Sequence, residues 1–440
     1  MLFGTDGVRG LANGEVLTPE LATALARSAA RELLARRAPG TRATAVIGRD
    51  TRPSGPMLEA AAAAGFASAG LDVLLLGVVP TPVVAHVLAA GSADLGLVVS
   101  ASHNPMPDNG LKLFGPGGWK LDDDVEAAVE AGLRHPGERP TGVQVGSVAP
   151  APPHLVRAYV AGLLAAVPVP LTGLRVVVDC AEGAASALAP EVYRAAGADV
   201  VAIHAGGDGA RINDGCGATH LTSLQSAVLE HGADLGLAHD GDADRCLAVD
   251  ATGAVVDGDQ LLALLALGQH ERGELDTVVA TVMSNLGFVR AMRAAGIEVV
   301  QTAVGDRYVL AAMRAGGHPL GGEQSGHTVQ LRHATTGDGL LTGVTVLGRL
   351  AETGRPLADL AAVMTRLPQV LVNVRADRAR AQAPEVLAAV AVEEQGLDGN
   401  GRVLLRPSGT EALVRVMVEA ETADRAQAVA DRLAAVVGGS

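Results

Sequence analysis

The sequence is poor in aromatic residues and in positive charge. Phe, Trp and Tyr make up 2% of its 440 residues, too few for the stacking platforms that bind single-stranded nucleic acid. The 34 Lys and Arg residues are outnumbered by 48 Asp and Glu residues, and a net charge of -14 repels a nucleic-acid backbone or an anionic membrane. The composition therefore argues against polyanionic partners, so an anionic substrate would need cations placed locally.

Cysteine and long apolar runs are also scarce. Cys180, Cys216 and Cys246 are odd in number, lie far apart and form no C-x-x-C pair, so we expect reduced thiols and no structural zinc. The longest apolar stretch, 71–88, is interrupted by prolines and polar residues and is too broken for a membrane span. The start MLFGTDGVRG lacks the pattern of a signal peptide. These absences predict a cytoplasmic protein.

Internal repeats indicate the fold class. The segments 67–77, 194–204 and 293–303 each carry Ala-Gly, an apolar residue, an acid and then Val. This pattern predicts a helix that ends at a left-handed glycine, followed by a tight turn and a buried strand. A second pair, ADLGLVVS (93–100) and ADLGLAHD (233–240), runs into polar loops that carry Ser102 and Asp240. Because ligands gather at the carboxyl ends of parallel strands, two related domains are expected to direct these loops at one cleft.

The texture of the sequence changes after about residue 363. Up to that point strands and helices alternate, beginning with a helix that Thr18 and Pro19 should start. Beyond it, three apparent antiparallel strands at 370–376, 401–407 and 412–420 precede a helix at 423–437. We predict three similar α/β domains with mixed or parallel sheets plus a smaller C-terminal α+β domain around a central cleft. The expected bounds are 1–150, 151–254, 255–366 and 367–440.

Two loops carry the residue types needed for chemistry. SASHNPMPDNGLK (100–112) is a rigid loop that presents Ser102, His103 and Lys112, although an ordinary surface loop is the plain alternative. It lacks the G-x-S-x-G setting of a hydrolase. DGDADR (240–245) has carboxylates at alternate positions, which in an extended loop point to one side and call for Mg²⁺ or Ca²⁺. An EF-hand is excluded, whereas a solvated acidic turn stays open.

Two further loops carry groups suited to binding. GGEQSGH (321–327) has Glu323, Ser325 and His327 between glycines, a layout that suits sugar hydroxyls. RPSGTEALVR (406–415) combines guanidinium groups, hydroxyls and turn N–H groups, which suit phosphate oxygens, with a β-turn as the simpler alternative. Its candidate ligands are Arg406, Ser408, Gly409, Thr410 and Arg415.

Taken together, these motifs resemble those of the α-D-phosphohexomutases. The shared segments are FGTDGVRG (3–10), SASHNP (100–105), DNGLK (108–112), DGDADR (240–245), VGDRYV (304–309), GGEQSGH (321–327) and RPSGTE (406–411). The resemblance implies four domains around one deep cleft, a phosphoserine and one Mg²⁺ per subunit. Ala243 and Ala412 stand where the family often has Gly and Pro. We expect Ala243 to be tolerated in an extended loop if its φ is negative.

The resemblance also implies a role for each motif residue. Ser102 corresponds to the phosphorylated serine and, through its phosphoryl group, to a metal ligand. The other implied metal ligands are Asp240, Asp242 and Asp244. Arg9 is implied to hold the phosphoserine loop, and Arg245 and Lys112 to stabilise the transferred group. His103 or Lys112 would move the proton of the attacking hydroxyl, a choice that the sequence leaves open. The implied sugar and phosphate ligands are Glu323, Ser325, His327, Arg406, Ser408, Gly409, Thr410 and Arg415.

The implied reaction interconverts glucosamine 6-phosphate and glucosamine 1-phosphate through glucosamine 1,6-bisphosphate, and it supplies UDP-N-acetylglucosamine synthesis. The expected partner is a small phosphosugar, and a homodimer is one assembly that the sequence allows. A phosphoglucomutase or phosphomannomutase of the same family is the close alternative. A phosphatase would need no second phosphate site, and a non-catalytic binding protein would be expected to have lost the serine or a metal ligand.

Overall fold

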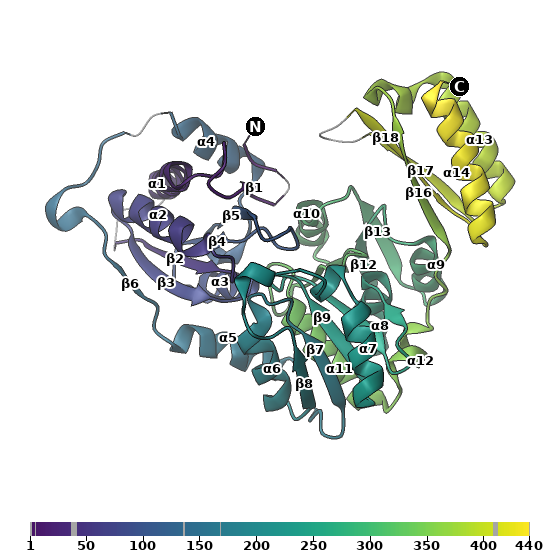
Figure 1. Cartoon of the computed structure of the whole chain (residues 1–440), viewed down its shortest axis with the longest axis horizontal. Coiled ribbons are helices and arrows are strands. Elements are labelled where there is room, and N and C mark those ends of the chain that lie inside the picture. Colours follow the sequence, from purple (N-terminus) through teal and green to yellow (C-terminus); the bar gives the residue numbers. More distant parts are fainter. Residues whose placement is uncertain are drawn as a thin grey trace. The chain divides into compact units, whose positions relative to one another are not determined.

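The computed structural model describes residues 2–4, 6–36, 42–134, 137–167, 169–407 and 412–439. The chain divides into two compact units: Met1–Val282 with Ile297–Ala362, and Met283–Gly296 with Val363–Ser440 (Figure 1). Within the described residues the first unit holds three sheets and the second unit holds a fourth.

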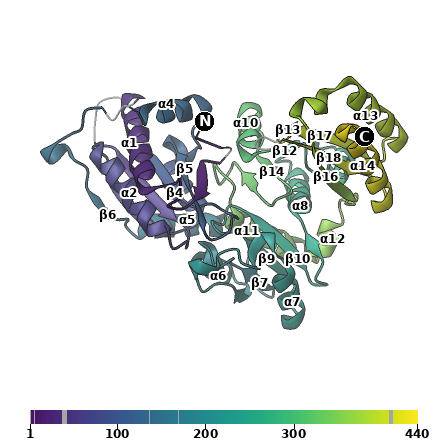
Figure 2. The same ribbon diagram turned by 45° about the horizontal axis from the view of Figure 1, so that its top comes forward.

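The first sheet is the centre of an α/β/α sandwich. Its strand order is β1-β5-β4-β2-β3-β6. The strands are β1 (Val8–Leu11), β2 (Thr44–Arg49), β3 (Asp72–Val78), β4 (Leu95–Val99), β5 (Asp108–Phe114) and β6 (Val148–Pro150). One face packs against α1 (Pro19–Arg36), α2 (Gly55–Ser68) and α4 (Asp123–Gly132), and the other against α3 (Thr81–Ala89), which contacts α5 (His154–Ala165). Figure 2 shows α1 and α2 beside this sheet from a second direction.

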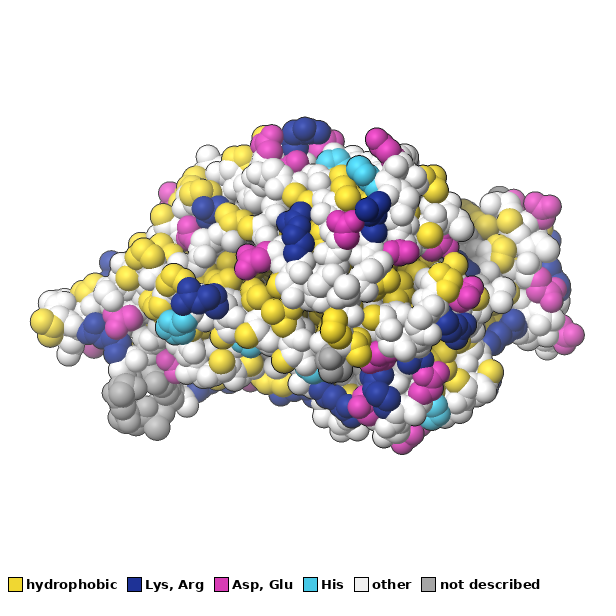
Figure 3. All heavy atoms as spheres, turned by 90° about the horizontal axis from the view of Figure 1, so that it is seen from below, with side chains coloured by type: hydrophobic (Ala, Val, Ile, Leu, Met, Phe, Trp, Pro, Cys, Tyr) yellow, Lys and Arg dark blue, Asp and Glu magenta, His cyan; other side chains and the backbone are white. Residues whose placement is uncertain are grey.

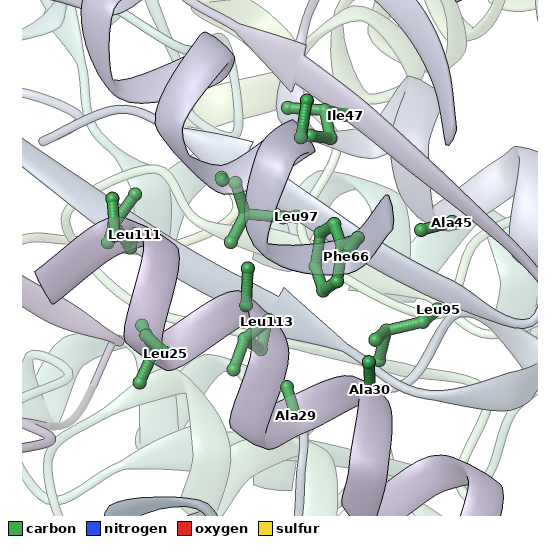
Figure 4. Packing of buried hydrophobic residues seen from close by; sticks show 14 of the residues in the cluster. Leu25, Ala29, Ala30, Ala45, Ile47, Phe66, Leu95, Leu97, Leu111 and Leu113 are labelled. Carbon is green, nitrogen blue, oxygen red and sulfur yellow. The ribbon is translucent and has the colours of Figure 1, made fainter. Parts of the chain in front are cut away.

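The core under α1 and α2 is built mainly from alanine and leucine. Phe66 of α2 is fully buried and packs with residues such as Leu25, Leu97 and Leu113 (Figure 4). Small alanines let the two helices approach each other and the sheet closely. The predicted start of α1 is confirmed, because Thr18 Oγ1 accepts a hydrogen bond from the N–H of Leu21 at 3.2 Å.

The second and third sheets follow a related plan. The second has the order β11-β10-β9-β7-β8, and the third β13-β12-β14-β15. Their strands are β7 (Arg175–Asp179), β8 (Asp199–Ile203), β9 (Leu235–His239), β10 (Cys246–Asp250), β11 (Val255–Val256), β12 (Thr277–Thr281), β13 (Glu298–Thr302), β14 (Leu320–Gly322) and β15 (Thr328–Gln330). The second sheet has α7 (Thr222–His231) on one face and α6 (Ala185–Ala195) with α11 (Gly339–Thr353) on the other. In the third, α10 (Asp306–Gly316) and α8 (Gly258–Glu271) lie on opposite faces of β14.

The three sheets repeat one topology. The repeat begins with β2, β7 or β12, which is central; the next strand of the repeat pairs parallel on one side of it, and the third pairs parallel on the other side. A fourth strand then runs antiparallel to the third: β5 on β4, β10 on β9, and β15 on β14. The loops between the third and fourth strands are the segments that carry Ser102, the aspartates and Glu323. The three predicted catalytic and sugar-binding loops are therefore equivalent loops of three repeats.

The predicted helix-to-strand joints are partly right. Gly70, Gly197 and Gly296 have φ values of +94°, +107° and +78°, so each needs the conformational freedom of glycine, as expected. The strands that follow them are only half-buried, however, and the prediction of buried strands is wrong. The reason is their position in the sheet. β8 and β13 are edge strands, and β3 is flanked by the short β6.

The fourth sheet has the antiparallel strands predicted from the sequence. β16 (Gln369–Arg375), β18 (Leu413–Glu419) and β17 (Arg402–Pro407) lie in that order. The predicted last helix is α14 (Ala423–Gly438), and α13 (Pro384–Leu397), which the sequence did not suggest, shares its core. The remaining helices are α9 (Leu286–Ala294) and α12 (Leu357–Ala361), with short 3₁₀ turns η1 (Pro116–Gly118), η2 (Gly142–Gln144), η3 (Gly209–Arg211), η4 (Gly217–Thr219) and η5 (Arg378–Gln382). The predicted fold class, three α/β domains and a C-terminal α+β domain, is confirmed.

Charged side chains of both signs are mixed with apolar ones over the face drawn in Figure 3. Among the helices of the described ranges, none combines the length and the apolar character needed to cross a bilayer.

Candidate active site

Ser102 lies in the loop between β4 and β5, at the carboxyl edge of the first sheet. Its hydroxyl donates a hydrogen bond to Oδ2 of Asp240 at 2.5 Å and lies 3.3 Å from Nδ1 of His103. The residue is 1% exposed, and its φ of +54° is a left-handed conformation that is costly for a residue with a Cβ atom. The loop thus turns the serine hydroxyl inward, onto an aspartate of the second sheet.

A buried arginine that sequence reasoning missed holds this loop. Arg52 lies between β2 and α2, is fully buried, and donates from Nε to Oδ2 of Asp50 at 2.9 Å. Its terminal nitrogens donate to four loop carbonyls: Ser102 at 3.0 Å, Asn104 at 2.7 Å, Pro105 at 2.5 Å and Asp108 at 2.9 Å. The rigid fork of a guanidinium suits such a set of acceptors. The signal was present in GRDTR (48–52), a charged segment at the carboxyl end of β2.

The second repeat also supports the serine loop. Nδ2 of Asn213 donates to the carbonyl oxygens of Ser102 at 2.9 Å and of Asn104 at 3.2 Å. Arg9, the predicted partner of the loop, donates to the carbonyl oxygen of Ala101 at 3.2 Å. The predicted contact between Arg9 and this segment is therefore present in the structure.

The three aspartates converge, but not for the predicted reason. Carboxylate oxygens of Asp240, Asp242 and Asp244 all lie within 4.8 Å of one another. The sequence suggested an extended loop, in which Ala243 would be tolerated if its φ were negative; the extended loop is wrong, because Ala243 has a φ of +56°. A turn, not an extended strand, brings the carboxylates together. The left-handed alanine costs about 1–2 kcal/mol, and its carbonyl oxygen accepts the N–H of Gly339 at 3.0 Å.

Lys112 is a fixed cation beside the aspartates. Its Nζ lies 2.7 Å from Oδ2 of Asp242, 3.3 Å from Oδ2 of Asp244 and 2.9 Å from Oδ2 of Asp6. Burial alone would favour the neutral amine, but the carboxylates of Asp242, Asp6 and Asp244 outweigh it and hold the pKa of Lys112 well above its usual value. Lys112 is therefore protonated at neutral pH and is unable to accept a proton.

His103 has the opposite electrostatic setting. Burial, followed by the positive charges of Arg245 and Arg9, lowers the pKa of His103 to about 4. The imidazole is therefore neutral near pH 7 and has a ring nitrogen able to accept a proton. Of the two candidates for proton transfer, the electrostatics of this structure favour His103 over Lys112.

The aspartate loop fits a hard divalent cation. Oδ1 of Asp242 and Oδ1 of Asp244 are buried and have no hydrogen-bond partner within the described part of the chain. Burial, followed by the charges of Asp244 and Asp242, raises the pKa of Asp240 to about 7, a repulsion that a cation would relieve. The donor atoms are all carboxylate oxygens, which Mg²⁺ and Ca²⁺ prefer to nitrogen or sulfur.

The predicted sugar-binding loop connects β14 to β15. Oε1 of Glu323 accepts the N–H of Gly305 at 3.1 Å, which orients its carboxylate. Oγ of Ser325 and both ring nitrogens of His327 are buried, and none has a hydrogen-bond partner among residues that the structure describes. Buried polar groups are rarely left unpaired, so these atoms are suited to a polar ligand.

A cavity of about 400 Å³ adjoins these residues. The predicted site residues in its lining come from all three repeats: Arg9, His103, Asp244, Arg245, Glu323 and His327. Nε of Arg245 lies 3.8 Å from Oδ2 of Asp240 and 3.9 Å from Oδ1 of Asp244, so it faces the aspartate loop as well as the cavity. The volume suits a small ligand, and the lining is polar and charged of both signs.

A network of ion pairs that the sequence analysis did not single out joins two edges of the cavity. Lys120 pairs with Asp6 and with Asp306, and Asp6 also binds Arg9 and Lys112. Nε2 of His327 lies 3.7 Å from Oδ2 of Asp306. Asp6 and Asp306 stand in the motifs FGTDGVRG and VGDRYV, so the motifs were recognised but their acidic residues were not assigned.

The predicted phosphate-binding segment lies in the second unit and is partly described. Arg406 of β17 and Arg415 of β18 are direct cross-strand partners, so both side chains lie on one face of the sheet. That face is opposite the core of α13 and α14, which takes Val414 and Val416. Like charges directly opposite each other are destabilising, and an anion between them would relieve this. Ser408, Gly409 and Thr410 lie outside the described residues.

Four segments of the chain match the domains of one protein family. Residues 1–139, 157–253 and 257–367 match the α/β/α domains I, II and III of the phosphoglucomutase/phosphomannomutase family, and 371–436 match its C-terminal domain. The chain belongs to this family, the α-D-phosphohexomutases, as its motifs predicted.

Within the family, the similarity is high to proteins named phosphoglucosamine mutase. The one from Frankia casuarinae is 65% identical over 447 residues, covering 99% of this chain and 98% of its own, and the one from Saccharopolyspora erythraea is 63% identical over 440 residues. Among solved structures, a phosphoglucomutase/phosphomannomutase family protein from Burkholderia thailandensis matches with a TM-score of 0.83 at 27% identity, covering 100% of this chain and 97% of that one.

A more distant relative shares the fold. The N-acetylphosphoglucosamine mutase of Aspergillus fumigatus, solved in complex with GlcNAc-6P and magnesium, matches with a TM-score of 0.67 at 19% identity. The match covers 100% of this chain and 96% of that one.

Proposed function

We propose that this chain is a phosphoglucosamine mutase that interconverts glucosamine 6-phosphate and glucosamine 1-phosphate. The observation that carries the proposal is the junction of the two loops, where the Ser102 hydroxyl meets Asp240 at 2.5 Å inside the aspartate cluster. The amino-sugar substrate is favoured by identities of 61–65% to proteins named for that activity. The product would supply UDP-N-acetylglucosamine synthesis.

In this proposal Ser102 carries the phosphoryl group that is transferred. The bond from phosphorus to Oγ of Ser102 breaks, and a bond from phosphorus to the free hydroxyl oxygen of the sugar phosphate forms. The hydroxyl proton passes to the neutral His103, whose Nδ1 lies 3.3 Å from Oγ, and from there to the serine oxygen. The resulting glucosamine 1,6-bisphosphate turns over in the site. The same steps in reverse then return its other phosphoryl group to Ser102.

The charged side chains act by position. Lys112, Arg9 and Arg245 provide fixed positive charge around the transferred group, and such placed charge is the main contribution to phosphoryl transfer. Asp240, Asp242 and Asp244 would hold one Mg²⁺ per subunit. When bound, Mg²⁺ neutralises charge on phosphoryl oxygens, including those of phosphorylated Ser102.

The remaining motifs would bind the substrate. Glu323, Ser325 and His327 offer a carboxylate, a hydroxyl and an imidazole to the sugar. The phosphate that is not reacting would bind Arg406 and Arg415 together with Ser408, Gly409 and Thr410.

We propose that these loops belong to four domains with bounds near 150, 254 and 366. The enzyme is proposed to act in the cytoplasm, which free, buried cysteines support. The assembly proposed for the enzyme is a homodimer, and light scattering, which measures the mass in solution, would test it.

A side-by-side assay tests the function. Purified protein with Mg²⁺ and a trace of the matching sugar bisphosphate is offered glucosamine 6-phosphate, glucose 6-phosphate and mannose 6-phosphate, and each 1-phosphate product is measured. We expect the highest kcat/KM with glucosamine 6-phosphate. A higher value with glucose 6-phosphate or mannose 6-phosphate would assign the chain to the other activities of the family. Release of inorganic phosphate without isomerisation would instead identify a phosphatase.

A further inference from the structure

A second cluster of potential metal ligands lies in the second repeat and shares no residue with the aspartate loop. Asp179 is the last residue of β7, His204 follows β8, and Cys216 precedes η4. One ligand atom from each of these residues lies within 4.8 Å of the other two. Asp179 is 0% and Cys216 1% exposed, and the His204 side chain is 25% exposed. The cluster is therefore largely buried, with one edge open at the imidazole.

The imidazole of His204 faces the carboxylate of Asp179. Its Nδ1 atom lies 3.1 Å from Oδ2 of Asp179, and the contact with this carboxylate raises the pKa of His204. The pair therefore holds a proton between a nitrogen and an oxygen that both belong to the cluster. A metal ion needs a deprotonated carboxylate and a neutral imidazole, so a cation bound here would take the place of that proton.

The other two residues are positioned by the backbone. Oδ1 of Asp179 accepts the N–H of Ala181 at 2.9 Å, and Oδ2 accepts the N–H of Gly217, also at 2.9 Å. Each oxygen keeps a lone pair for a further partner. Sγ of Cys216 donates a long hydrogen bond of 3.9 Å to the carbonyl oxygen of Arg211. Asp179 is thus oriented by backbone hydrogen bonds of the kind that hold metal-binding carboxylates in proteins.

We propose that Asp179, His204 and Cys216 form a binding site for a thiophilic divalent cation of the Zn²⁺ class. One sulfur, one nitrogen and one oxygen ligand suit Zn²⁺ or Co²⁺, whereas Mg²⁺ and Ca²⁺ prefer oxygen alone. Three protein ligands leave a fourth position, which water fills from the open edge at His204. On binding, a metal–sulfur bond replaces the S–H bond of Cys216, and the thiol proton is released to solvent.

The site would stabilise the segment that supports Ser102. Cys216 lies three positions after Asn213, whose side chain holds the carbonyl oxygens of Ser102 and Asn104. The N–H of Asn213 in turn binds the carbonyl oxygen of Ala181, two residues after Asp179. A bound cation would therefore join the loops after β7 and β8 to the segment 213–216, whose Asn213 supports the serine loop. Its role is structural and lies outside the phosphoryl transfer itself.

Cobalt provides the test, because a thiolate bound to Co²⁺ gives a charge-transfer absorption that oxygen and nitrogen ligands do not. Full-length protein is treated with chelator, dialysed, and titrated with Co²⁺ in saturating Mg²⁺, which occupies the aspartate loop. We expect the thiolate absorption to saturate at one Co²⁺ per chain. Cys216→Ser should abolish this absorption, and Cys180→Ala and Cys246→Ala, which change the other two buried thiols, should retain it.

A second variant and a stability measurement distinguish loss of the metal site from misfolding. His204→Asn keeps a polar side chain of similar reach but removes the imidazole, and it should weaken Co²⁺ and Zn²⁺ binding at least about tenfold. Zn²⁺ should raise the Tm of the wild type and of Asp242→Asn but not that of Cys216→Ser. The proposal is overturned if no thiolate absorption develops, if Cys216→Ser retains it, or if Asp242→Asn alone removes the binding.

Discussion

The loops that follow β4 and β9 start from nearly the same sequence and differ in chemistry. Both strands are fully buried, and each lies between a parallel central strand and an antiparallel neighbour. Each loop also contains one residue with a Cβ atom in the left-handed conformation, Ser102 in the first and Ala243 in the second. The first loop presents one hydroxyl and the second presents three carboxylates, so one framework carries the two halves of the proposed phosphoryl-transfer site.

Each loop depends on the other repeat for its support. Lys112 of β5 neutralises Asp242 and Asp244 of the second loop, and Asn213 of the second repeat holds the carbonyl of Ser102. Each repeat also supplies an arginine to its own loop: Arg52 donates to the backbone of the serine loop, and Arg245 faces Asp240 and Asp244. The comparison teaches that the backbone of the serine loop is held mainly by a buried arginine of its own repeat. The closest ion pair of the aspartate loop, at 2.7 Å, is made with Lys112 of the first repeat.

The largest effect is expected at the serine. Ser102→Ala removes the oxygen that carries the phosphoryl group, so turnover should be abolished while the fold persists. Intact-mass measurement of the wild type should find a subpopulation heavier by one phosphoryl group, and the variant should lack it. Ser226→Ala, which changes an exposed hydroxyl of α7, should keep the heavier species. Near-normal activity in Ser102→Ala would contradict the covalent route.

The aspartate loop should fail differently. Asp242→Asn replaces a charged ligand by a neutral amide, and we expect Mg²⁺ affinity to fall at least about tenfold, together with the rate. The Tm without Mg²⁺ should change little, because Lys112 still has Asp244 and Asp6 as partners. Asp250→Asn, at the far end of β10, is the matched control and should leave the Mg²⁺ dependence unchanged. Unaltered Mg²⁺ dependence in Asp242→Asn would remove the loop from the metal site.

Arg415, in the predicted phosphate-binding segment of the second unit, sharpens the comparison, because its loss should leave both loops intact. Arg415→Ala removes a charge-assisted contact of about 1.5–3 kcal/mol, roughly one to two decades in affinity. Substrate binding should weaken and the bisphosphate should escape, so that added glucosamine 1,6-bisphosphate restores activity. Arg402→Ala is unsuitable as a control because its partner Glu419 is fully buried. Arg432→Ala, which breaks an exposed pair with Glu393 on the outer face of α14, should bind substrate normally. Normal affinity in Arg415→Ala would place the phosphate elsewhere.

Arg52 tests whether the serine loop is supported from within. Arg52→Lys keeps the charge beside Asp50, but one ammonium is unable to reach four carbonyl oxygens. We expect unfolding free energy to fall by about 1–3 kcal/mol, together with slower phosphorylation of Ser102. Mg²⁺ affinity should stay near that of the wild type. Arg49→Lys, at a partly exposed pair with Glu59, is the control. Equal losses in both variants would show that Arg52 has no special role.

The smallest effect is expected at Ala243. Ala243→Gly relieves a left-handed alanine but increases the conformational freedom of the unfolded chain, and these terms oppose each other. The net change in unfolding free energy should be within about 1 kcal/mol, and Mg²⁺ affinity should be unchanged. Ala238→Gly, in the buried strand β9, should be clearly destabilising, as expected for a glycine in a strand. A large loss in Ala243→Gly would mean that the methyl group packs in an essential way.

Sequence patterns determined the loops, their order along the chain and the fold class. The reason is that ADLGLVVS, ADLGLAHD and the Ala-Gly joints are local signals of strand, loop and helix end, which neighbouring residues set by themselves. The Ala-Gly joint of the third repeat was found, but its strand-to-loop pattern was not, because β14 is only Leu-Gly-Gly, too short and too small to show a strand pattern. Its equivalence to β4 and β9 became visible only through the strand order of the sheets.

Tertiary structure alone decided which residues meet. Arg52, Asp6, Lys120 and Asn213 act through contacts with segments from 50 to more than 100 residues away, and no local pattern marks such partners. The same holds for Asp179, His204 and Cys216. Their spacing in the chain argued against a zinc site, yet the edge of the second sheet brings their ligand atoms within 4.8 Å. The protonation states also depend on the fold. Whether His103 or Lys112 accepts a proton depends on burial and on charges from other segments, which only the folded chain supplies.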